Sequence, residues 1–330
     1  MNSNEPIMRV ENLQVYFPVK RNIKQILTGE EKKSVKAVDG VSFDLIEGKT
    51  LALVGESGCG KTTLGKTIVR LNRPINGSIF YDGQNIANDE AWKTNVLRKD
   101  IQYVFQDPYA SLNPKMTVLD TVKRPMDIFN LYSQDERTDR ALALLKKTGI
   151  STAQAYRYPH EFSGGQRQRI CVARALAVEP KIIIADEPTS ALDVSIQCQI
   201  LDLLTGLQKE LGITMLFISH DLGVVNYISD DVLVMYLGHV VEQGNTHEIF
   251  KHPAHPYTQA LLEALPKRGS SNHTARTKLK GYIPSPIDPP KGCLLHPRCP
   301  YATEKCCKVV PEMQPVGEGR MVACHYPFVK

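Results

Sequence analysis

Residues 51–63 read LALVGESGCGKTT, and the predicted fold is organised around this stretch. It contains the pattern G-x-x-x-x-G-K-T between Gly55 and Thr62, which is typical of a phosphate-binding P-loop. Residues 50–54 form an apolar run that favours a buried strand, and residues 63–71 are predicted to be a helix. Because a strand before the loop and a helix after it are the context that the motif requires, the sequence predicts a nucleotide-binding loop.

The residue types of this loop explain how it can hold phosphate. Glycines let the backbone turn its N–H groups toward the phosphates, and the following helix N-terminus adds its positive end. Lys61 can reach the β- and γ-phosphates, and Thr62 can offer a hydroxyl to Mg²⁺. The predicted binding residues of the loop are Gly55, Glu56, Ser57, Gly58, Cys59, Gly60, Lys61, Thr62 and Thr63.

An acidic pair follows a second apolar strand, residues 181–188 (KIIIADEP). In open α/β sheets ligands bind beyond the carboxyl ends of the strands. Asp186 can hold Mg²⁺, directly or through water, and Glu187 can orient or deprotonate a water that attacks the γ-phosphate. His220, at the end of a predicted strand over residues 213–219, can hydrogen-bond the γ-phosphate, although a helix cap is an equal reading.

Residues 162–169 (FSGGQRQR) predict a second phosphate site. Ser163 is a natural N-cap of a helix running to about residue 178, and Gly164 and Gly165 allow another group to approach closely. Such a helix N-terminus can receive an anion, although a flexible loop before a helix is the alternative.

The order of predicted elements indicates an α/β fold. Residues 8–17 and 35–46 alternate apolar and polar side chains, as half-buried strands do, and residues 101–105 form another strand. Residues 117–131 and 135–149 read as helices that interrupt the alternation of strands and helices, so we expect a separate helical lobe there.

Composition excludes several classes of protein. The 330 residues are 42% hydrophobic and 23% charged with a net charge of +5, as in ordinary soluble domains, and this charge does not argue for a nucleic-acid partner. No apolar run reaches the roughly 18 residues of a membrane span, and the first residues lack the pattern of a signal peptide. We therefore expect a cytoplasmic chain. Residues 20–33 are charged and are expected to form a surface loop, and residues 267–278, rich in Ser, Thr and basic residues, are expected to form a linker.

The eight cysteines are unevenly distributed. Cys171 and Cys198 fall in predicted helices and are expected in the core. Five crowd the C-terminal region: Cys293, Cys299, Cys306, Cys307 and Cys324. In a cytoplasmic chain this crowding favours a metal site over disulfides. Four thiolates can bind a [4Fe–4S] cluster or Zn²⁺, with Cys307 able to replace Cys306; unligated thiols in a packed tail are the alternative.

Over residues 8–244 the chain resembles the ATP-binding subunit of an ABC transporter. GESGCGKT is similar to the family's Walker A motif, IIIADEP to Walker B, and FSGGQ to the signature LSGGQ with Phe for Leu. SALD, ending at Asp193, is similar to the D-loop, and Gln106 and His220 match the Q-loop and H-loop positions. Phe17 best matches the adenine-stacking aromatic, with Tyr16 as the alternative.

The resemblance implies a fold and a mechanism. It implies a RecA-like P-loop NTPase core with an N-terminal antiparallel β subdomain and an inserted helical subdomain at about residues 107–178. The ATP-binding domain would span residues 1–244, and a small cysteine-containing extension residues 245–330. ATP and Mg²⁺ are implied, with Mg²⁺ held through Thr62, Gln106 and Asp186. The implied catalytic residues are Glu187, His220 and Gln106.

The resemblance also implies a dimer. Two such domains face head to tail, so that each ATP is held by one P-loop and by the partner's signature residues. These residues are Ser163, Gly164, Gly165 and Gln166.

Three further stretches resemble dipeptide and oligopeptide importers: FQDPYASLNPKM, HPAHPYTQALLEALP and PSPIDPPKGCLLHPRCPYATEKC. This implies a heterodimer of ATPase subunits on the cytoplasmic face of the membrane, with two permease subunits and an extracytoplasmic binding protein. Some members are held to carry an iron–sulfur cluster, so Cys293, Cys299, Cys306 and Cys324 are expected to bind [4Fe–4S] rather than zinc.

Other cargoes and another class stay open at this point. Nickel and glutathione importers share the tail. A soluble ABC-type ATPase acting on nucleic acid or ribosomes is the rival from another class, but such proteins usually carry two cassettes, and this chain has one and lacks a basic, aromatic-rich insertion.

Overall fold

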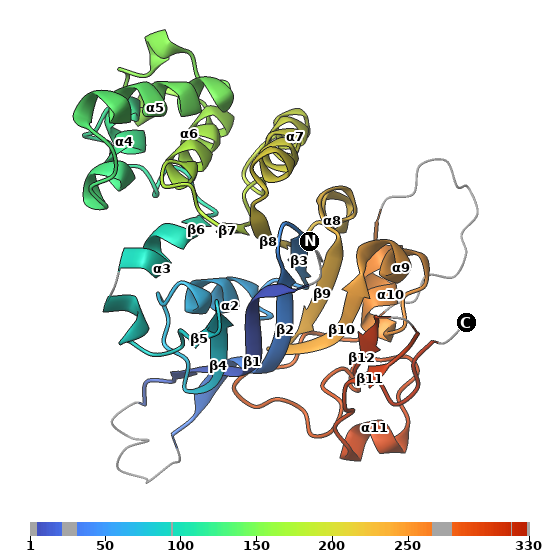
Figure 1. The fold of residues 1–330 in the computed structure, drawn as a ribbon. Coiled ribbons are helices and arrows are strands. Elements are labelled where there is room, and N and C mark those ends of the chain that lie inside the picture. The colour runs from blue at the N-terminus through green and yellow to red at the C-terminus, as the bar shows by residue number, and fades with distance from the viewer. Residues whose placement is uncertain (1–4, 22–31, 94, 266–278, 318, 329–330) are drawn as a thin grey trace. The chain divides into compact units, whose positions relative to one another are not determined.

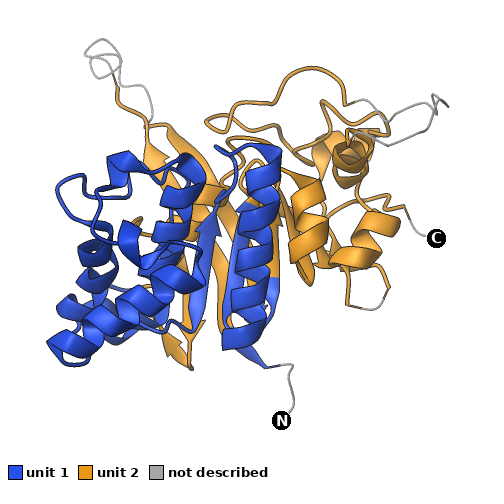
Figure 2. Ribbon diagram, turned by 90° about the horizontal axis from the view of Figure 1, so that it is seen from above, with its two compact units in different colours: residues 1–7, 45–50, 88–218 blue, residues 8–44, 51–87, 219–330 orange. Residues whose placement is uncertain are grey.

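The computed structural model describes residues 5–21, 32–93, 95–265, 279–317 and 319–328. The linker predicted at 267–278 and most of the loop predicted at 20–33 lie outside these residues. Two compact units make up the chain, and each gathers segments that are far apart in sequence (Figure 2). Unit 1 contains residues 1–7, 45–50 and 88–218, and unit 2 contains residues 8–44, 51–87 and 219–330.

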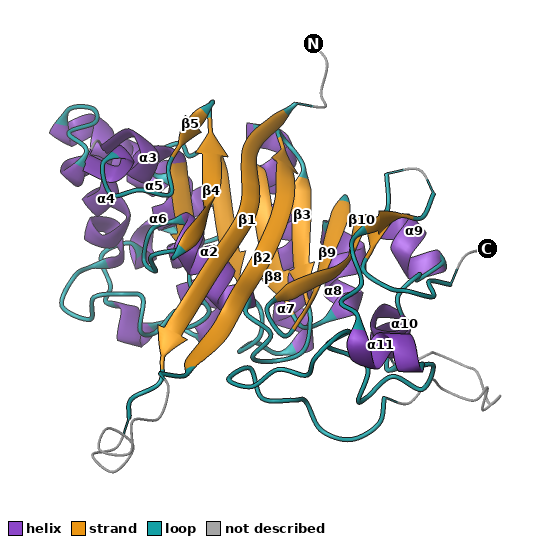
Figure 3. Cartoon of the chain, turned by 90° about the horizontal axis from the view of Figure 1, so that it is seen from below, coloured by secondary structure: helices purple, strands orange, loops and turns teal. Residues whose placement is uncertain are grey.

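Unit 2 holds most of an antiparallel sheet whose strand order is β2-β1-β4-β5 (Figure 3). Its strands are β1 (Pro6–Pro18), β2 (Ser34–Ile46), β4 (Asn76–Tyr81) and β5 (Gln84–Asn85). In β2, Val41 and Phe43 are buried and alternate with exposed neighbours, because successive side chains of a strand point to opposite faces. The alternating patterns at residues 8–17 and 35–46 therefore predicted these strands correctly.

Unit 2 also carries the strand that leads into the P-loop. β3 (Thr50–Val54) pairs in parallel with β9 (Asp231–Tyr236), which turns into antiparallel β10 (His239–Asn245). Two short strands extend the sheet beyond β10: β12 (Met321–Val322) pairs with β10, and β11 (Gln314–Pro315) pairs with β12. The helices of this unit are α2 (Lys61–Ile68), α8 (Leu222–Ile228), α9 (Thr246–Lys251), α10 (Pro256–Glu263) and α11 (Glu304–Lys308).

One apolar core joins these elements of unit 2. Val54 of β3 packs with Val234 of β9, with Tyr257 of α10 and with Leu295 of the C-terminal extension. Cys293 and Cys299 are partly buried against the same cluster. The strand that carries the P-loop and the cysteine-bearing tail therefore share one core.

Unit 1 contains three parallel strands in the order β8-β7-β6. They are β6 (Ile101–Val104), β7 (Ile182–Asp186) and β8 (Thr214–Ser219). Every residue of β7 and β8 is buried, as expected for parallel strands covered on both faces. The helices are α3 (Asn95–Asp100), α4 (Val118–Ile128), α5 (Gln134–Lys147), α6 (Gly164–Leu176) and α7 (Val194–Leu211), with short 3₁₀ turns at Ala91–Lys93, Thr152–Gln154 and Pro159–Glu161.

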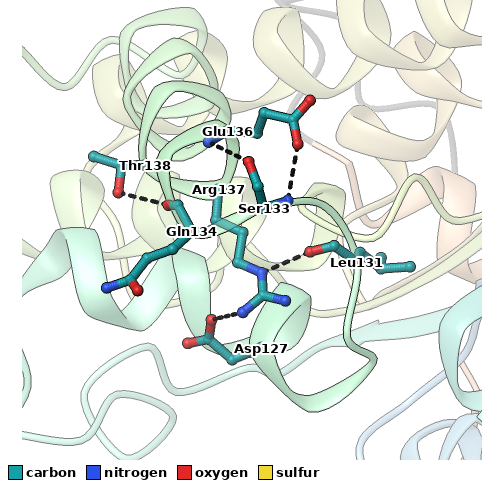
Figure 4. A network of polar contacts seen from close by, with 7 residues as sticks. All are labelled: Asp127, Leu131, Ser133, Gln134, Glu136, Arg137 and Thr138. Carbon is teal, nitrogen blue, oxygen red and sulfur yellow. Dashed lines mark hydrogen bonds and ion pairs between the residues drawn. The ribbon is translucent and has the colours of Figure 1, made fainter.

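Within unit 1, α4, α5 and α6 pack on one another as the inserted helical lobe (Figure 1). The start of α5 is fixed by a capping box, in which Ser133 accepts from the Glu136 N–H and the Glu136 carboxylate accepts from the Ser133 N–H (Figure 4). Arg137 then donates to the carbonyl of Leu131 and to Asp127, at 2.6 and 2.9 Å. These contacts tie α5 to the end of α4.

One expectation about the helices is wrong. Cys171 is buried in α6 as expected, but Cys198 is exposed. The buried side of α7 contains Ile200, Leu201 and Leu204, and Cys198 lies outside that stripe. Among the described residues, none of the helices combines the length and the apolarity that crossing a bilayer demands.

Candidate nucleotide-binding and hydrolysis site

The P-loop of unit 2 folds around its own lysine. Lys61 is the first residue of α2 and is only 5% exposed. Its ammonium donates to the carbonyls of Gly55 and Glu56, at 2.7 and 3.2 Å. Gly60 has φ 110°, and a Cβ there would lie closer than 3.0 Å to the carbonyl oxygen of Ala37. Glycine is therefore required at this position, and the positive charge of Lys61 is held at the N-terminus of α2.

Glu56 links the loop to residues that lie far away in the sequence. Its backbone N–H donates to the hydroxyl of buried Tyr257, at 2.8 Å. Its carboxylate accepts two hydrogen bonds from Arg298, at 2.6 and 3.0 Å. The Arg298 guanidinium also donates to the hydroxyl of Tyr236 at 3.4 Å. Tyr257 and Arg298 were not predicted from the sequence, where the one local signal was the acidic residue within a phosphate-binding loop.

The remaining residues of the loop differ in exposure. Ser57 and Gly58 are exposed, while Thr62 and Thr63 are half-buried. Cys59 is buried, and this burial raises the pKa of its thiol despite the nearby ammonium of Lys61. The thiol is therefore kept protonated inside the loop.

The two aromatic candidates for adenine stacking have different surroundings. The Tyr16 hydroxyl donates to Asp39 at 2.6 Å, and the ammonium of Lys36 lies 5.6 Å from the centre of its ring. Phe17 is 40% exposed. The Phe17 ring is thus the more accessible of the two.

In unit 1 the structure brings Gln106, Asp186 and Glu187 together where β6 and β7 end. Asp186 is 2% exposed and accepts from the Tyr103 hydroxyl at 2.8 Å. The Gln106 side-chain amide donates to the Glu187 carboxylate at 2.9 Å. Glu187 has φ 45°, and its N–H donates to the carbonyl of Ile218 at 2.9 Å. A non-glycine residue in this region costs about 1–3 kcal/mol and is typical of functional sites.

Tyr103 was not predicted as part of this site. Burial, followed by the charge and hydrogen bond of Asp186, raises the pKa of its hydroxyl. The hydroxyl therefore stays a donor to Asp186 throughout the neutral range. Only its place in an apolar strand was visible in the sequence.

The predicted signature segment starts α6 in unit 1. Ser163 is the N-cap, as expected, and forms a capping box with Gln166 through bonds of 3.1 and 3.4 Å. A Cβ on Gly165 would lie closer than 3.0 Å to Cγ2 of Ile196 in α7, so this glycine also has a packing role. Ser163 and Gly164 are exposed at the helix N-terminus.

Two other predicted residues lie at helix starts. Asp193 is exposed as the N-cap residue of α7. His220 is exposed in unit 2, immediately before Asp221, whose carboxylate accepts from the N–H of Gly223 as the N-cap of α8.

Four of the five C-terminal cysteines converge in unit 2. They line one cavity of about 20 Å³, together with three histidines and other side chains. The four are Cys293, Cys299, Cys306 and Cys324. Burial raises the pKa of Cys293 and Cys299, and raises that of Cys324 to about 11. Cys307 is exposed, and its thiol donates to the carbonyl of Thr303 instead.

The cysteine cavity does not have the geometry of a single-ion site. In the part of the chain that the structure describes, no three His, Cys, Asp or Glu side chains are placed to hold one metal ion. The four cysteines line a shared cavity without converging on one ion position.

Comparison with known proteins agrees with this geometry. Residues 38–190 match the family model "ABC transporter", and residues 241–306 match "Oligopeptide/dipeptide transporter, C-terminal region". The oligopeptide transport ATP-binding protein AppF of Bacillus subtilis is 50% identical, with 98% of each chain covered. The dipeptide transport ATP-binding protein DppF of Escherichia coli is 45% identical, over 97% of this chain and 94% of that protein.

Solved structures show the same fold. The structure of cbiO1 from Clostridium perfringens, part of the ABC transporter complex cbiONQ, has a TM-score of 0.63 and 32% identity, over 75% of this chain and 91% of its own. The dimeric structure of MJ0796, a bacterial ABC transporter cassette, has a TM-score of 0.62 and 32% identity, over 72% of this chain and 98% of its own. The chain therefore belongs to the ATP-binding proteins of the ABC transporter family, in the branch that carries the oligopeptide/dipeptide transporter C-terminal region.

Proposed function

We propose that this chain binds and hydrolyses ATP to power the import of dipeptides or oligopeptides through a membrane permease. The observation that carries this proposal is the extent of the similarity to peptide transport ATP-binding proteins, which runs through the C-terminal extension as well as the ATPase region. Nickel and glutathione are the less favoured cargoes, because the relatives at 44–50% identity are named for peptides.

The residues of unit 2 would bind the nucleotide. Lys61 and the amides of the P-loop would hold the phosphates at the N-terminus of α2. Phe17 would stack on the adenine, supported by its exposed ring. His220 would hydrogen-bond the γ-phosphate, and its exposure at the end of a strand suits that role.

The residues of unit 1 would perform the hydrolysis. Glu187 would orient the attacking water and accept its proton, and Gln106 would fix the Glu187 carboxylate through their hydrogen bond. Thr62 of unit 2, Gln106 and Asp186 offer hydroxyl, amide and carboxylate oxygens, which are the donors that Mg²⁺ prefers. When bound, Mg²⁺ neutralises charge on the phosphates.

We further propose an assembly. Ser163, Gly164, Gly165 and Gln166 would contact the ATP held by a second ATP-binding subunit, and Asp193 would lie at that dimer interface as the D-loop. The exposed N-terminus of α6 supports this proposal. The subunit pair would act on two permease subunits at the cytoplasmic face of the membrane, with an extracytoplasmic binding protein delivering the cargo. In this proposal, residues 1–244 form the ATP-binding domain and residues 245–330 the extension.

The cysteine cavity would hold a [4Fe–4S] cluster. Cys293, Cys299, Cys306 and Cys324 would supply one thiolate to each iron. Four thiols that line one cavity support a cluster over Zn²⁺, which draws its ligands to about 2.3 Å from one point. Iron and sulfide analysis of the anaerobically purified chain tests this assignment, and stoichiometric zinc would contradict it.

The function is tested by uptake of labelled di- and oligopeptides in cells that express Lys61→Ala, with Lys66→Ala on the same helix as the matched control. Peptide uptake should be lost with Lys61→Ala, with normal protein levels, and kept with Lys66→Ala. Normal uptake with Lys61→Ala, in cells without a redundant system, would contradict the peptide assignment, and nickel uptake would then be measured.

A further inference from the structure

The C-terminal extension places an arginine on the P-loop. Arg298 donates to both carboxylate oxygens of Glu56, at 2.6 and 3.0 Å. The two side chains are only 9% and 26% exposed. Such a bidentate, charge-assisted pair is among the stronger side-chain interactions. The planar guanidinium also fixes the orientation of the Glu56 carboxylate.

The charge of Glu56 makes this contact relevant to nucleotide binding. A phosphate-binding loop favours anions through its lysine and its backbone N–H groups, and a carboxylate within the same loop opposes them. Because the Glu56 side chain is partly buried, solvent and salt screen its charge incompletely. The Arg298 guanidinium neutralises this charge through its two hydrogen bonds to the Glu56 carboxylate.

The backbone of Arg298 is held by two hydrogen bonds within the extension. Its N–H donates to the Leu295 carbonyl at 2.8 Å, and its own carbonyl accepts from the Lys280 N–H at 2.9 Å. The next residue, Cys299, also donates its N–H to the Leu295 carbonyl and lines the cysteine cavity. The arginine is therefore presented to the P-loop by the same turn that carries one of the cavity thiols.

We propose that Arg298 is a positioning residue of the nucleotide site, and that the cysteine-bearing extension sets ATP affinity by neutralising and holding Glu56. This inference rests on the proposed function, since it assigns a role to Arg298 at the proposed ATP site. It makes the extension a part of the site rather than a separate appendage.

Binding of a fluorescent ATP analogue to the full-length chain tests the proposal, with unlabelled ATP and AMP as competitors. Arg298→Gln should weaken ATP binding about tenfold, within the range of typical couplings between linked sites. AMP binding should change less, because AMP carries one phosphate and ATP three, so the Glu56 carboxylate repels AMP less. Arg298→Lys keeps the charge and should retain most of the affinity.

Two further variants separate charge from stability. The double variant Glu56→Gln with Arg298→Gln removes both charges and should recover most of the affinity lost in Arg298→Gln. Arg320→Gln is the matched control, because Arg320 also forms a largely buried pair in the extension, at 3.1 Å from Glu242, but does not contact Glu56. It should leave ATP affinity unchanged even where it lowers thermal stability.

The outcomes are distinct. Unchanged ATP affinity in Arg298→Gln overturns the proposal, as does an equal loss in Arg320→Gln, or a double variant that binds no better than the single one. Loss of ATP binding in Lys61→Ala verifies the nucleotide site independently. Failure of the unaltered chain to bind ATP would overturn the proposed function, and the inference with it.

Discussion

Replacing Tyr103 with phenylalanine removes one hydroxyl group and little else. The ring would stay in β6 against Phe105, whose centre lies 4.6 Å away. The lost contact is the 2.8 Å hydrogen bond to Asp186, which is 2% exposed. Hydrogen bonds to charged groups contribute roughly 1.5–3 kcal/mol. We therefore expect the free energy of unfolding to fall by about 2 kcal/mol.

The same change should affect the use of Mg²⁺. In the proposed site Asp186 is a ligand, and the Tyr103 hydroxyl fixes the orientation of its carboxylate. Losing about 1.4 kcal/mol of that orientation would raise the Mg²⁺ concentration needed for half-maximal ATPase activity about tenfold. Denaturant unfolding and ATPase activity over a series of Mg²⁺ concentrations measure the two effects.

The pH dependence of this contribution has a definite sign. Burial and Asp186 raise the pKa of Tyr103 in the folded chain above the ordinary value of about 10. The stabilisation is therefore complete below about pH 10 and declines only as the pH rises further. The difference between the variant and the unaltered chain should stay constant from pH 6 to 9, a range set by that value of about 10.

Tyr109→Phe is the matched control. Tyr109 is exposed in the same segment, and its ring lies 5.0 Å from the Arg167 guanidinium carbon, so removal of its hydroxyl should change stability by less than about 0.5 kcal/mol. If Tyr103→Phe matches the unaltered chain in both assays, or if Tyr109→Phe loses as much, the assignment of Tyr103 as a support for Asp186 is refuted.

Two more predictions follow from packing and from burial. Gly165→Ala should cost about 1–3 kcal/mol and reduce ATPase activity, because the new methyl group meets Ile196, and adding Ile196→Ala should restore stability; denaturant unfolding would show whether it does. Burial lowers the pKa of His255 to about 3, below its ordinary value of about 6.5. Below about pH 6.5 the unfolded chain therefore binds a proton that the folded chain does not bind. The free energy of unfolding should then fall by up to about 1.4 kcal/mol for each pH unit below about 6.5. His255→Gln should reduce this dependence of the free energy of unfolding on pH, as measured by urea unfolding between about pH 7 and pH 4. An unchanged dependence in the variant would contradict the prediction.

The sequence was sufficient for elements that carry a long or strongly patterned signal. The buried runs of β3, β7 and β8 were all predicted, because a run of apolar residues is a property of the local chain. The helix α8 was not predicted. Its residues LGVVNYI are rich in β-branched side chains and include a glycine, which favour strand or turn. The Asp221 cap, which accepts from Gly223 and Val224, supports a helix there instead.

The short elements of the extension were missed for another reason. Helix α11 has five residues, and β11 and β12 have two each, so no period can be read from them. These elements exist because their surroundings pack them. Cys198 was misplaced for a related reason, since a helical pattern defines the spacing of an apolar stripe but not which neighbouring cysteine falls outside it.

The residues of the site likewise include some that the sequence predicts and some that only the structure shows. Lys61, Asp186 and Glu187 are recognisable because each belongs to a motif with a local spacing. Tyr103 and Arg298 act through contacts between residues that are 83 and 242 positions apart in the chain, and no local pattern encodes such pairs. The residues that support the predicted groups are therefore visible only in the folded chain.

The acid in the P-loop shows why this matters for function. An unpaired carboxylate beside a polyphosphate would weaken ATP binding, so a loop that contains Glu56 requires a cation from elsewhere in the fold. The extension supplies it at a fixed position, because Leu295, at the start of the turn that presents Arg298, packs in the same apolar core as Val54 of β3. The core thus brings the strand that leads into the loop and the turn that neutralises it into one packed structure. A disturbance of the turn that presents Arg298 would therefore reach the loop through the hydrogen bonds between Arg298 and Glu56.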